Sequence, residues 1–209
     1  MMNIAVLVSG GGTNLQALID AQNRGEIKNG KITLVISSNP DAYALERVAN
    51  NGIAARVIDR KAFNDIKSYT KAVTDALIEA KADLIVYAGF MTILDEQIVN
   101  AFPNKMMNVH PALIPSFCGK GFYGLHVHDA VLASGVKLTG ATVHFVTEEC
   151  DGGPIILQKA VEVRNGDTSE ILQKRVMENC EWKILPQAVS LFCEGRIKVI
   201  GNKTEIVEV

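Results

Sequence analysis

Two polar residues near the end of a predicted strand have a spacing that suits stabilisation of an oxyanion. Asn108 and His110 are two positions apart, so their side chains point to the same side of a strand. An amide N–H and an imidazolium N–H placed together can stabilise a developing oxyanion. Pro111 then fixes the chain as it leaves the strand. A second interpretation stays open, in which His110 is a core histidine bonded to the backbone and Asn108 only ends the strand.

An acidic segment further along the chain could act on that histidine. Glu148, Glu149 and Asp151 precede a Gly-Gly-Pro turn at residues 152–154. A carboxylate near His110 would favour the imidazolium and raise its pKa above the usual value of about 6.5. Most charge runs are solvated loops, and we expect Glu148 and Glu149 to be of that kind.

A glycine-rich turn near the start of the chain has the composition of an anion site. Gly10, Gly11 and Gly12 stand between a predicted strand and a predicted helix. Glycines let the backbone approach an anion, and the helix N-terminus offers unpaired N–H groups and a positive dipole. Thr13 and Asn14 add side-chain donors, so the turn suits a phosphate monoester. A tight turn that binds nothing is the alternative.

This turn does not match two common nucleotide motifs. No Gly-Lys-Ser/Thr follows it, which excludes a Walker loop. Leu15 stands where the dinucleotide fingerprint has its third glycine.

The remaining histidines give weaker signals. His126 and His128 could ligate a metal, but no third ligand stands at a useful spacing, so we expect no metal. His144 alternates with Thr142 in a predicted strand. These two side chains either support one pocket together, or His144 is a hydrogen-bonded core residue.

Composition excludes several classes of protein. The chain has 209 residues, 48% hydrophobic and 21% charged, which is ordinary for a globular protein. Its net charge of −2 disfavours a broad basic surface for nucleic acid, and no apolar stretch reaches the ~20 residues of a membrane span. The four cysteines are widely spaced without a C-x-x-C pair, so we expect reduced thiols and a cytoplasmic location. Cys118 would be reactive if its loop is exposed, although ordinary loop cysteines are more frequent.

Hydrophobic patterning predicts an α/β fold with a mostly parallel, twisted, Rossmann-like sheet and helices on both faces. The expected strands of the first half are Ile4–Val8, Ile32–Ile36, Ala54–Ile58, Leu84–Tyr87 and Met106–Val109. Helices are expected between them, one of them capped by Asp41.

The second half is expected to add an antiparallel C-terminal extension. Its predicted elements are a helix over His126–Ser134, β runs over Thr139–Val146 and Pro154–Val163, a long helix within Glu170–Cys193, and a closing hairpin over Ile197–Val199 and Glu205–Val207. Thr168 or Ser169 should cap the long helix, and Pro186 should kink or divide it. We expect a single domain over residues 1–209, with a phosphate-binding half to about residue 109 and a catalytic-loop half from about residue 110.

Five motifs in order resemble the phosphoribosylglycinamide formyltransferase family, the folate-dependent transformylases of purine synthesis. They are SGGGTN at residues 9–14, AGFMTIL at 88–94, NVHPALIPSF at 108–117, GATVHFV at 140–146 and CDGGPIILQ at 150–158. Each motif alone is modest, but the set covers nearly the whole chain. The resemblance implies the formyltransferase fold. It also implies transfer of the formyl group of 10-formyltetrahydrofolate, a co-substrate, to the amine of glycinamide ribonucleotide.

The family's functional residues map onto definite positions. The resemblance implies a catalytic trio of Asn108, His110 and Asp151. It implies contacts to the ribonucleotide and its phosphate by Gly11, Gly12, Thr13, Asn14, Gly89, Pro111 and Glu181. It implies folate contacts by Phe90, Met91, Thr92, Ile93, Leu94, Asn108, Thr147, Glu148, Glu149, Cys150, Asp151 and Lys67.

The chain departs from the family at three places. The residues between Pro115 and Gly124 are longer than in shorter members and resemble a flexible flap over the site. Thr92 stands where some relatives have an arginine. Ile66 stands where the family has a basic residue, with Lys67 next to it.

Other functions remain as alternatives. Methionyl-tRNA formyltransferase shares the strand-end motif but has a further C-terminal domain and a basic surface. Formyltetrahydrofolate hydrolase shares the trio but has an extra N-terminal domain, for which a first strand at residue 3 leaves no room. A non-catalytic nucleotide-sensing domain of Rossmann type, or an interaction scaffold, would not need the trio. The expected partners are small molecules, with neither nucleic acid nor membrane, and a homodimer is compatible with the sequence.

Overall fold

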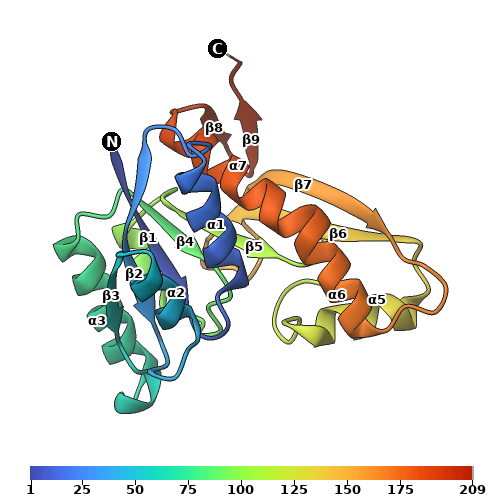
Figure 1. Cartoon of the computed structure of the whole chain (residues 1–209), viewed down its shortest axis with the longest axis horizontal. Coiled ribbons are helices and arrows are strands. Elements are labelled where there is room, and N and C mark those ends of the chain that lie inside the picture. Colours follow the sequence, from blue (N-terminus) through green and yellow to red (C-terminus); the bar gives the residue numbers. More distant parts are fainter. Residues whose placement is uncertain (209) are drawn as a thin grey trace. The chain divides into compact units, whose positions relative to one another are not determined.

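The structure is a computed structural model that describes residues 1–208, and it divides into two compact units. Unit 1 comprises Met1–Asn108, and unit 2 begins at Val109. Figure 1 shows the course of the chain through both units. The expectation of a single domain stays a prediction.

Unit 1 is built on parallel strands. They are β1 (Met2–Val8), β2 (Gly30–Ser37), β3 (Ala54–Val57), β4 (Leu84–Tyr87) and β5 (Met106–His110), whose last two residues belong to unit 2. The order is β3-β2-β1-β4-β5, and each neighbouring pair is parallel. The side chains of Ile4–Val8 are fully buried, as expected for a parallel strand covered on both faces.

The helices of unit 1 follow from this strand order. They are α1 (Thr13–Asn23), α2 (Ala44–Asn50), the 3₁₀ turn η1 (Arg60–Ala62), α3 (Ile66–Glu79) and α4 (Glu96–Ala101). The chain runs outward from β1 through α1 and α2, and then returns to the other side through α3 and α4. Right-handed crossovers therefore place α1 and α2 on one face of the sheet and α3 and α4 on the other. In agreement, α1 packs on α2 and α3 packs on α4. The prediction of helices on both faces is confirmed.

One predicted helix cap is wrong. Asp41 does not cap α2, because the residue at the N-cap is Tyr43. The backbone N–H of Asp41 instead bonds to the Asn39 side chain, which closes a turn before the helix begins. Asp65 and Asp95 cap α3 and α4 through their side chains.

Unit 2 combines an antiparallel pair, a helical layer and a hairpin. Its elements are α5 (Leu125–Ser134), β6 (Leu138–Phe145), β7 (Ile155–Glu162), α6 (Ser169–Val176), η2 (Met177–Glu181), α7 (Trp182–Cys193), β8 (Ile197–Ile200) and β9 (Lys203–Ile206). Strands β6 and β7 pair antiparallel with Thr142 opposite Gln158. Strands β8 and β9 form the predicted closing hairpin. The antiparallel C-terminal extension is confirmed.

The long C-terminal helix is divided, but not at Pro186 itself. Thr168 caps α6, the segment Met177–Glu181 winds as a π-helix, and Pro186 lies inside α7. A proline lacks the N–H that would bond four residues back and clashes with that carbonyl, here Trp182. The irregular winding therefore falls one turn before Pro186, directly ahead of Trp182.

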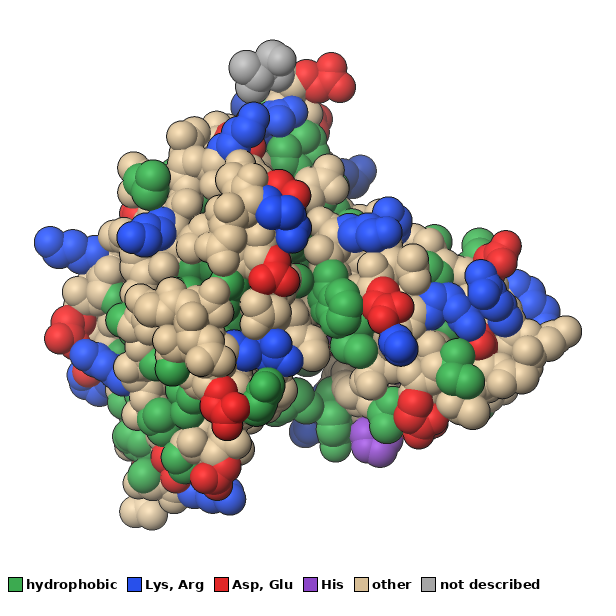
Figure 2. Space-filling view, viewed as in Figure 1, with side chains coloured by type: hydrophobic (Ala, Val, Ile, Leu, Met, Phe, Trp, Pro, Cys, Tyr) green, Lys and Arg blue, Asp and Glu red, His purple; other side chains and the backbone are tan. Residues whose placement is uncertain are grey.

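The surface carries charges of both signs. On the face drawn in Figure 2, Lys and Arg side chains are interspersed with Asp and Glu, and neither sign covers a broad area of that face. No helix within residues 1–208 is long and apolar enough to cross a membrane.

Candidate active site

The end of strand β5 presents the first part of the site. His110 is the last residue of β5 and is 4% exposed. Asn108, two positions earlier, is half-buried and lies opposite Tyr87 of β4. The two-residue spacing predicted from the sequence is therefore realised on a regular strand.

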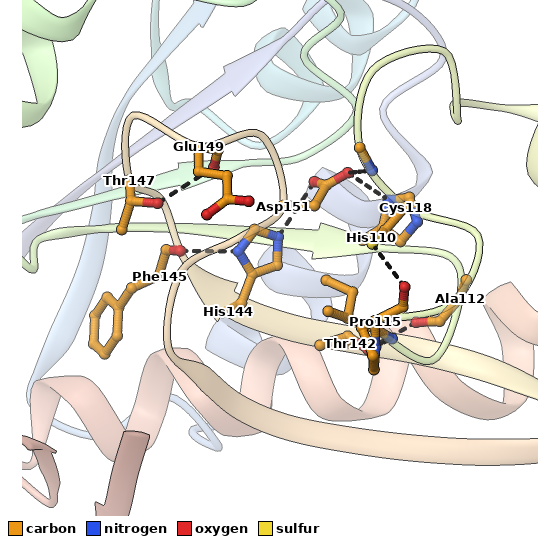
Figure 3. Close-up of polar contacts among 12 residues, drawn as sticks. His110, Ala112, Pro115, Cys118, Thr142, His144, Phe145, Thr147, Glu149 and Asp151 are labelled. Atoms are coloured by element: carbon orange, nitrogen blue, oxygen red, sulfur yellow. Dashed lines mark hydrogen bonds and ion pairs between the residues drawn. The ribbon is translucent and has the colours of Figure 1, made fainter. Parts of the chain in front are cut away.

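Asp151 lies between two histidines of unit 2. Its Oδ2 atom is 3.5 Å from the Nδ1 atom of His110, and its Oδ1 atom is 3.5 Å from the Nε2 atom of His144. The backbone N–H of Gly119 donates to Oδ2 at 2.9 Å. Figure 3 shows the carboxylate facing both imidazole rings. The structure thus brings together three residues that the sequence singled out separately.

The charge state of Asp151 follows from these neighbours. Burial alone would raise its pKa. The hydrogen bond from His144, the charge of His110 and the Gly119 N–H outweigh burial and lower the pKa to about 2. Asp151 is therefore a carboxylate at neutral pH.

The expected direction of the His110 pKa is wrong. Burial lowers the pKa of this histidine below its ordinary value, against the opposing effects of the Asp151 charge and the bond to Phe117. The carboxylate acts in the predicted sense, but desolvation of the ring is the larger effect. His110 needs a more acidic solution, or a bound substrate, to become imidazolium.

The loop after β5 contacts both catalytic candidates through its backbone. The Nε2 atom of His110 lies 2.8 Å from the carbonyl oxygen of Phe117, and Gly119 donates to Asp151. The sequence predicts a flap here, but it does not indicate these two contacts. Backbone groups carry no residue signature, so only the extra length and the glycines of the segment indicated a role.

Two polar side chains fix the start of that loop. Thr142 donates its hydroxyl to the Ala112 carbonyl at 2.7 Å and accepts the Ile114 N–H at 3.1 Å. Gln158, opposite it on β7, donates to the Thr142 hydroxyl at 2.9 Å and to the Ile114 carbonyl at 3.0 Å. Thr142 therefore supports the chain that follows His110, and Gln158 is a supporting residue that sequence analysis missed.

The turn that holds Asp151 depends on glycine. Asp151 has a φ of +57°, and a Cβ atom at Gly153 would overlap the carbonyl oxygen of Phe145. That oxygen also lies 2.8 Å from the Nδ1 atom of His144. The close approach of the Gly-Gly-Pro backbone to β6 thus fixes Asp151 beside His144.

The glycine-rich turn of unit 1 lies where the strand order reverses, between β1 and β4. Open α/β sheets bind ligands at this position. Gly12 has a φ of +69° and precedes α1 without a side-chain cap. Ser9 accepts the backbone N–H of Met91 at 3.0 Å, and its own N–H donates to the Gly89 carbonyl. Two predicted site segments, residues 9–14 and 89–91, are therefore adjacent.

The other predicted residues occupy varied surroundings. Glu181 is buried, whereas Met91 and Ile93 are more than half exposed, unusual for apolar side chains. Four further candidates are exposed, namely Lys67, Glu148, Glu149 and Cys150. His126 is exposed while His128 is fully buried, and residues 1–208 contain no group of three side chains able to hold a metal.

Comparison with known proteins defines the class. Residues 2–189 match the formyl transferase family model. The chain belongs to the formyl transferase family.

Within that family the chain is similar to enzymes of one kind. It is 40% identical over 201 residues to the phosphoribosylglycinamide formyltransferase of Escherichia coli K12, covering 96% of this chain and 92% of that protein. The crystal structure of glycinamide ribonucleotide transformylase 1 from Symbiobacterium toebii has a TM-score of 0.93 and 41% identity, covering 100% of this chain and 95% of that one. The predicted family, fold class and transferase activity are confirmed.

A longer relative extends beyond this chain. The trifunctional purine biosynthetic protein adenosine-3 of Bos taurus is 42% identical over 95% of this chain, but the match spans only 19% of that protein. The likeness concerns one part of the trifunctional protein.

Proposed function

We propose that this chain transfers the formyl group of 10-formyltetrahydrofolate to the amine of N1-(5-phosphoribosyl)glycinamide. The products are formylglycinamide ribonucleotide and tetrahydrofolate, in purine synthesis. The observation that carries the proposal is the His110–Asp151 pair at the end of β5, in a chain of the formyl transferase family.

The reaction proceeds by attack of the amine on the formyl carbon. The carbonyl oxygen gains negative charge, which the N–H groups of His110 and Asn108 stabilise. The amine loses a proton, and the folate nitrogen gains one as it leaves. Removing one oxyanion donor typically costs about 10²–10³ in rate.

Asp151 supports the histidine through charge and orientation. The carboxylate faces Nδ1 of His110, and the Phe117 carbonyl faces Nε2. Both oxygens only accept hydrogen bonds, so the ring can donate to both only as imidazolium. For the Nε2–H group to stabilise the formyl oxygen, that oxygen takes the place of the Phe117 carbonyl when the substrates bind. Asp151 also assists movement of the proton from the attacking amine to the leaving nitrogen.

The binding roles follow the family resemblance and the local structure. We assign the phosphate and ribonucleotide to Gly11, Gly12, Thr13, Asn14, Gly89, Pro111 and Glu181. We assign folate to residues 90–94, Asn108, residues 147–151 and, as a further contact, Lys67. The α1 N-terminus supports the phosphate assignment, because its N–H groups and dipole favour an anion.

The proposal includes a cellular setting. Formylfolate is a co-substrate, and the chemistry requires no metal. The cytoplasm is the inferred location because Cys118, Cys150, Cys180 and Cys193 are free thiols, as proteins in a reducing compartment usually have. The partners are the two small-molecule substrates, and a homodimer is compatible with this function.

The test compares His110→Ala with His126→Ala, an exposed histidine outside the proposed site. His110→Ala should lose about 10²-fold or more in kcat while binding of the ribonucleotide, measured by calorimetry, persists. His126→Ala should keep its turnover. Near-normal turnover of His110→Ala would refute the assigned role.

A further inference from the structure

Two cysteines flank the hydrogen bond that ties the loop after β5 to Asp151. Gly119 donates its N–H to the Asp151 carboxylate at 2.9 Å, across 32 positions of sequence. Cys118 directly precedes Gly119, and Cys150 directly precedes Asp151. Each cysteine is thus one Cα step, about 3.8 Å, from a residue of that bond. The fold thus brings together the two chain segments that carry these cysteines.

Both thiols are accessible from solution. Cys118 is partly exposed and Cys150 is exposed, whereas Cys180 and Cys193 are buried. The Cys118 thiol makes a weak hydrogen bond of 3.3 Å to the Pro115 carbonyl, which does not hold it firmly. A small oxidant can therefore reach this pair, while the buried pair is shielded.

The loop that carries Cys118 is rich in glycine. Gly119, Gly121 and Gly124 all have positive φ angles, which cost glycine nothing. The position of Cys118 relative to Cys150 is therefore set by an irregular, glycine-rich loop. A disulfide requires the Cα atoms of the two cysteines to lie within about 7 Å of each other.

The electrostatic surroundings set the reactivity of the pair. Burial and the Asp151 charge raise the pKa of both thiols, and Glu149 adds to the effect at Cys118. The charge of Cys118 also acts on Cys150, which reflects their proximity. At neutral pH both groups are mainly thiols, so oxidation is slow and should accelerate as the pH rises.

We propose that Cys118 and Cys150 form an oxidant-sensitive dithiol site beside the active-site carboxylate, at which a hydroperoxide forms a disulfide. One thiolate attacks a peroxide oxygen, the O–O bond breaks, and a sulfenic acid and water result. The second thiolate attacks the sulfenic sulfur, the S–S bond forms, and a second water leaves. Two thiols and one hydrogen peroxide thus give one disulfide and two waters, with sulfur oxidised and peroxide reduced.

The disulfide would act on the active site through the loop. The Phe117 carbonyl, next to Cys118, lies against Nε2 of His110, and Gly119 holds Asp151. A cross-link at Cys118 would keep these backbone groups on the two side chains. Turnover should then fall until the disulfide is reduced, a consequence that rests on the proposed function.

The test treats the full chain with hydrogen peroxide, at dilute protein concentration, and maps the cysteines by mass spectrometry after alkylation. A linked peptide pair containing residues 118 and 150 is expected, with Cys180 and Cys193 still alkylated after denaturation. Its rate of formation should rise about tenfold between pH 7 and pH 8, as the thiolate fraction does. Sulfinic acids without the 118–150 link, or links only between molecules, would overturn the proposal.

Activity separates this proposal from the proposed function. Each protein is compared with itself before peroxide, after peroxide and after dithiothreitol. The turnover of the wild-type chain should fall at least tenfold on cross-linking and recover on reduction. After peroxide, Cys118→Ser and Cys150→Ser should each keep the turnover that the same variant had before peroxide. Cross-linking without loss of turnover would overturn the effect on the site. Absence of turnover in the reduced protein would refute the proposed function, while the mapped disulfide would still stand.

Discussion

The Oδ2 atom of Asp151 lies 3.5 Å from the Nδ1 atom of His110, and both side chains are at least nine-tenths buried. At this separation and burial, the carboxylate charge acts strongly on the protonation of the ring. Burial nevertheless leaves the pKa of His110 below its ordinary value. The balance between the two effects can be measured by removing one of them.

Asp151→Asn should lower the pKa of His110 further. The substitution removes the charge that favours the imidazolium and leaves the burial that opposes it. NMR titration of the histidine ring protons measures this pKa directly. Turnover should fall by about 10²–10³, because the oxyanion site loses its cation over more of the pH range.

Glu149→Gln is the control for that titration. It removes a nearby exposed carboxylate that is not among the groups acting on His110. The His110 pKa should therefore remain where it is in the wild-type chain. A His110 pKa that is unchanged or raised in Asp151→Asn would contradict the electrostatic account.

Thr142→Val should loosen the loop that follows His110. The valine has a similar shape but cannot bond to the Ala112 carbonyl, the Ile114 N–H or the Gln158 amide. Each buried polar group left unpaired lowers the free energy of unfolding by about 1–3 kcal/mol. The midpoint temperature of thermal unfolding should therefore fall by several degrees. Turnover should fall while the pH profile keeps its shape.

Thr142→Ser keeps the hydroxyl and provides the matched control. It should retain most of the stability and turnover that Thr142→Val loses. If serine and valine have equal effects, the hydrogen bonds of Thr142 do not position the loop.

His128 should make the protein sensitive to acid. It is fully buried, neither ring nitrogen bonds to a protein atom within residues 1–208, and burial lowers its pKa to about 4. The folded state therefore binds fewer protons than the unfolded state between about pH 6.5 and pH 4. The stabilisation present above pH 6.5 is lost as the pH falls through this window, by about 3 kcal/mol.

His128→Leu should remove that part of the pH dependence and leave stability at pH 7.5 unchanged or higher, because the buried ring nitrogens have no protein partners to lose. Urea unfolding at several pH values measures the difference. In His126→Leu, a change at an exposed position, the free energy of unfolding should depend on pH as it does in the wild-type chain. If the free energy of unfolding of His128→Leu depends on pH as strongly as that of the wild-type chain, other groups cause the acid sensitivity.

Gly12 and Gly11 provide a matched pair in the glycine-rich turn. A Cβ atom at Gly12 would lie 2.7 Å from the Cβ atom of Ala44, and its φ of +69° strains any other residue. Gly12→Ala should therefore destabilise the fold by roughly 2 kcal/mol or more. At Gly11 nothing lies within 4 Å, so Gly11→Ala should fold normally.

Binding measurements then test the phosphate assignment. Calorimetric titration of folded Gly11→Ala with the ribonucleotide should show weaker binding, because the added methyl group hinders close approach of a phosphate to the backbone. Wild-type affinity in this variant would place the phosphate elsewhere.

Much of the fold could be predicted from local patterns. The continuous apolar run Ile4–Val8 indicates a strand buried on both faces, and β1 is such a strand. Thr168 or Ser169 could be placed at a helix start because such side chains cap the backbone that follows, and Thr168 is the cap of α6. The same reasoning failed at Asp41, which lies in a turn before α2. The position of the helix break before Pro186 could not be predicted, because a π-helix depends on how the turn before the proline packs.

The site was less predictable. The two-residue spacing of Asn108 and His110 follows from strand geometry, but their relation to Asp151 depends on a turn after β6 that no local pattern specifies. Phe117 and Gly119 act through backbone atoms, which any residue has. The His110 pKa required knowledge of burial, a property of the folded chain and not of its neighbours in sequence.

The most direct test of the central claim is a folate absorbance assay of the purified chain with 10-formyltetrahydrofolate, in the presence and absence of glycinamide ribonucleotide. We predict release of tetrahydrofolate only when the ribonucleotide is present, with one formylglycinamide ribonucleotide formed for each folate released. Release at the same rate without the ribonucleotide would identify a hydrolase. No release under either condition, with binding of the ribonucleotide retained, would contradict catalysis and favour a nucleotide-sensing domain.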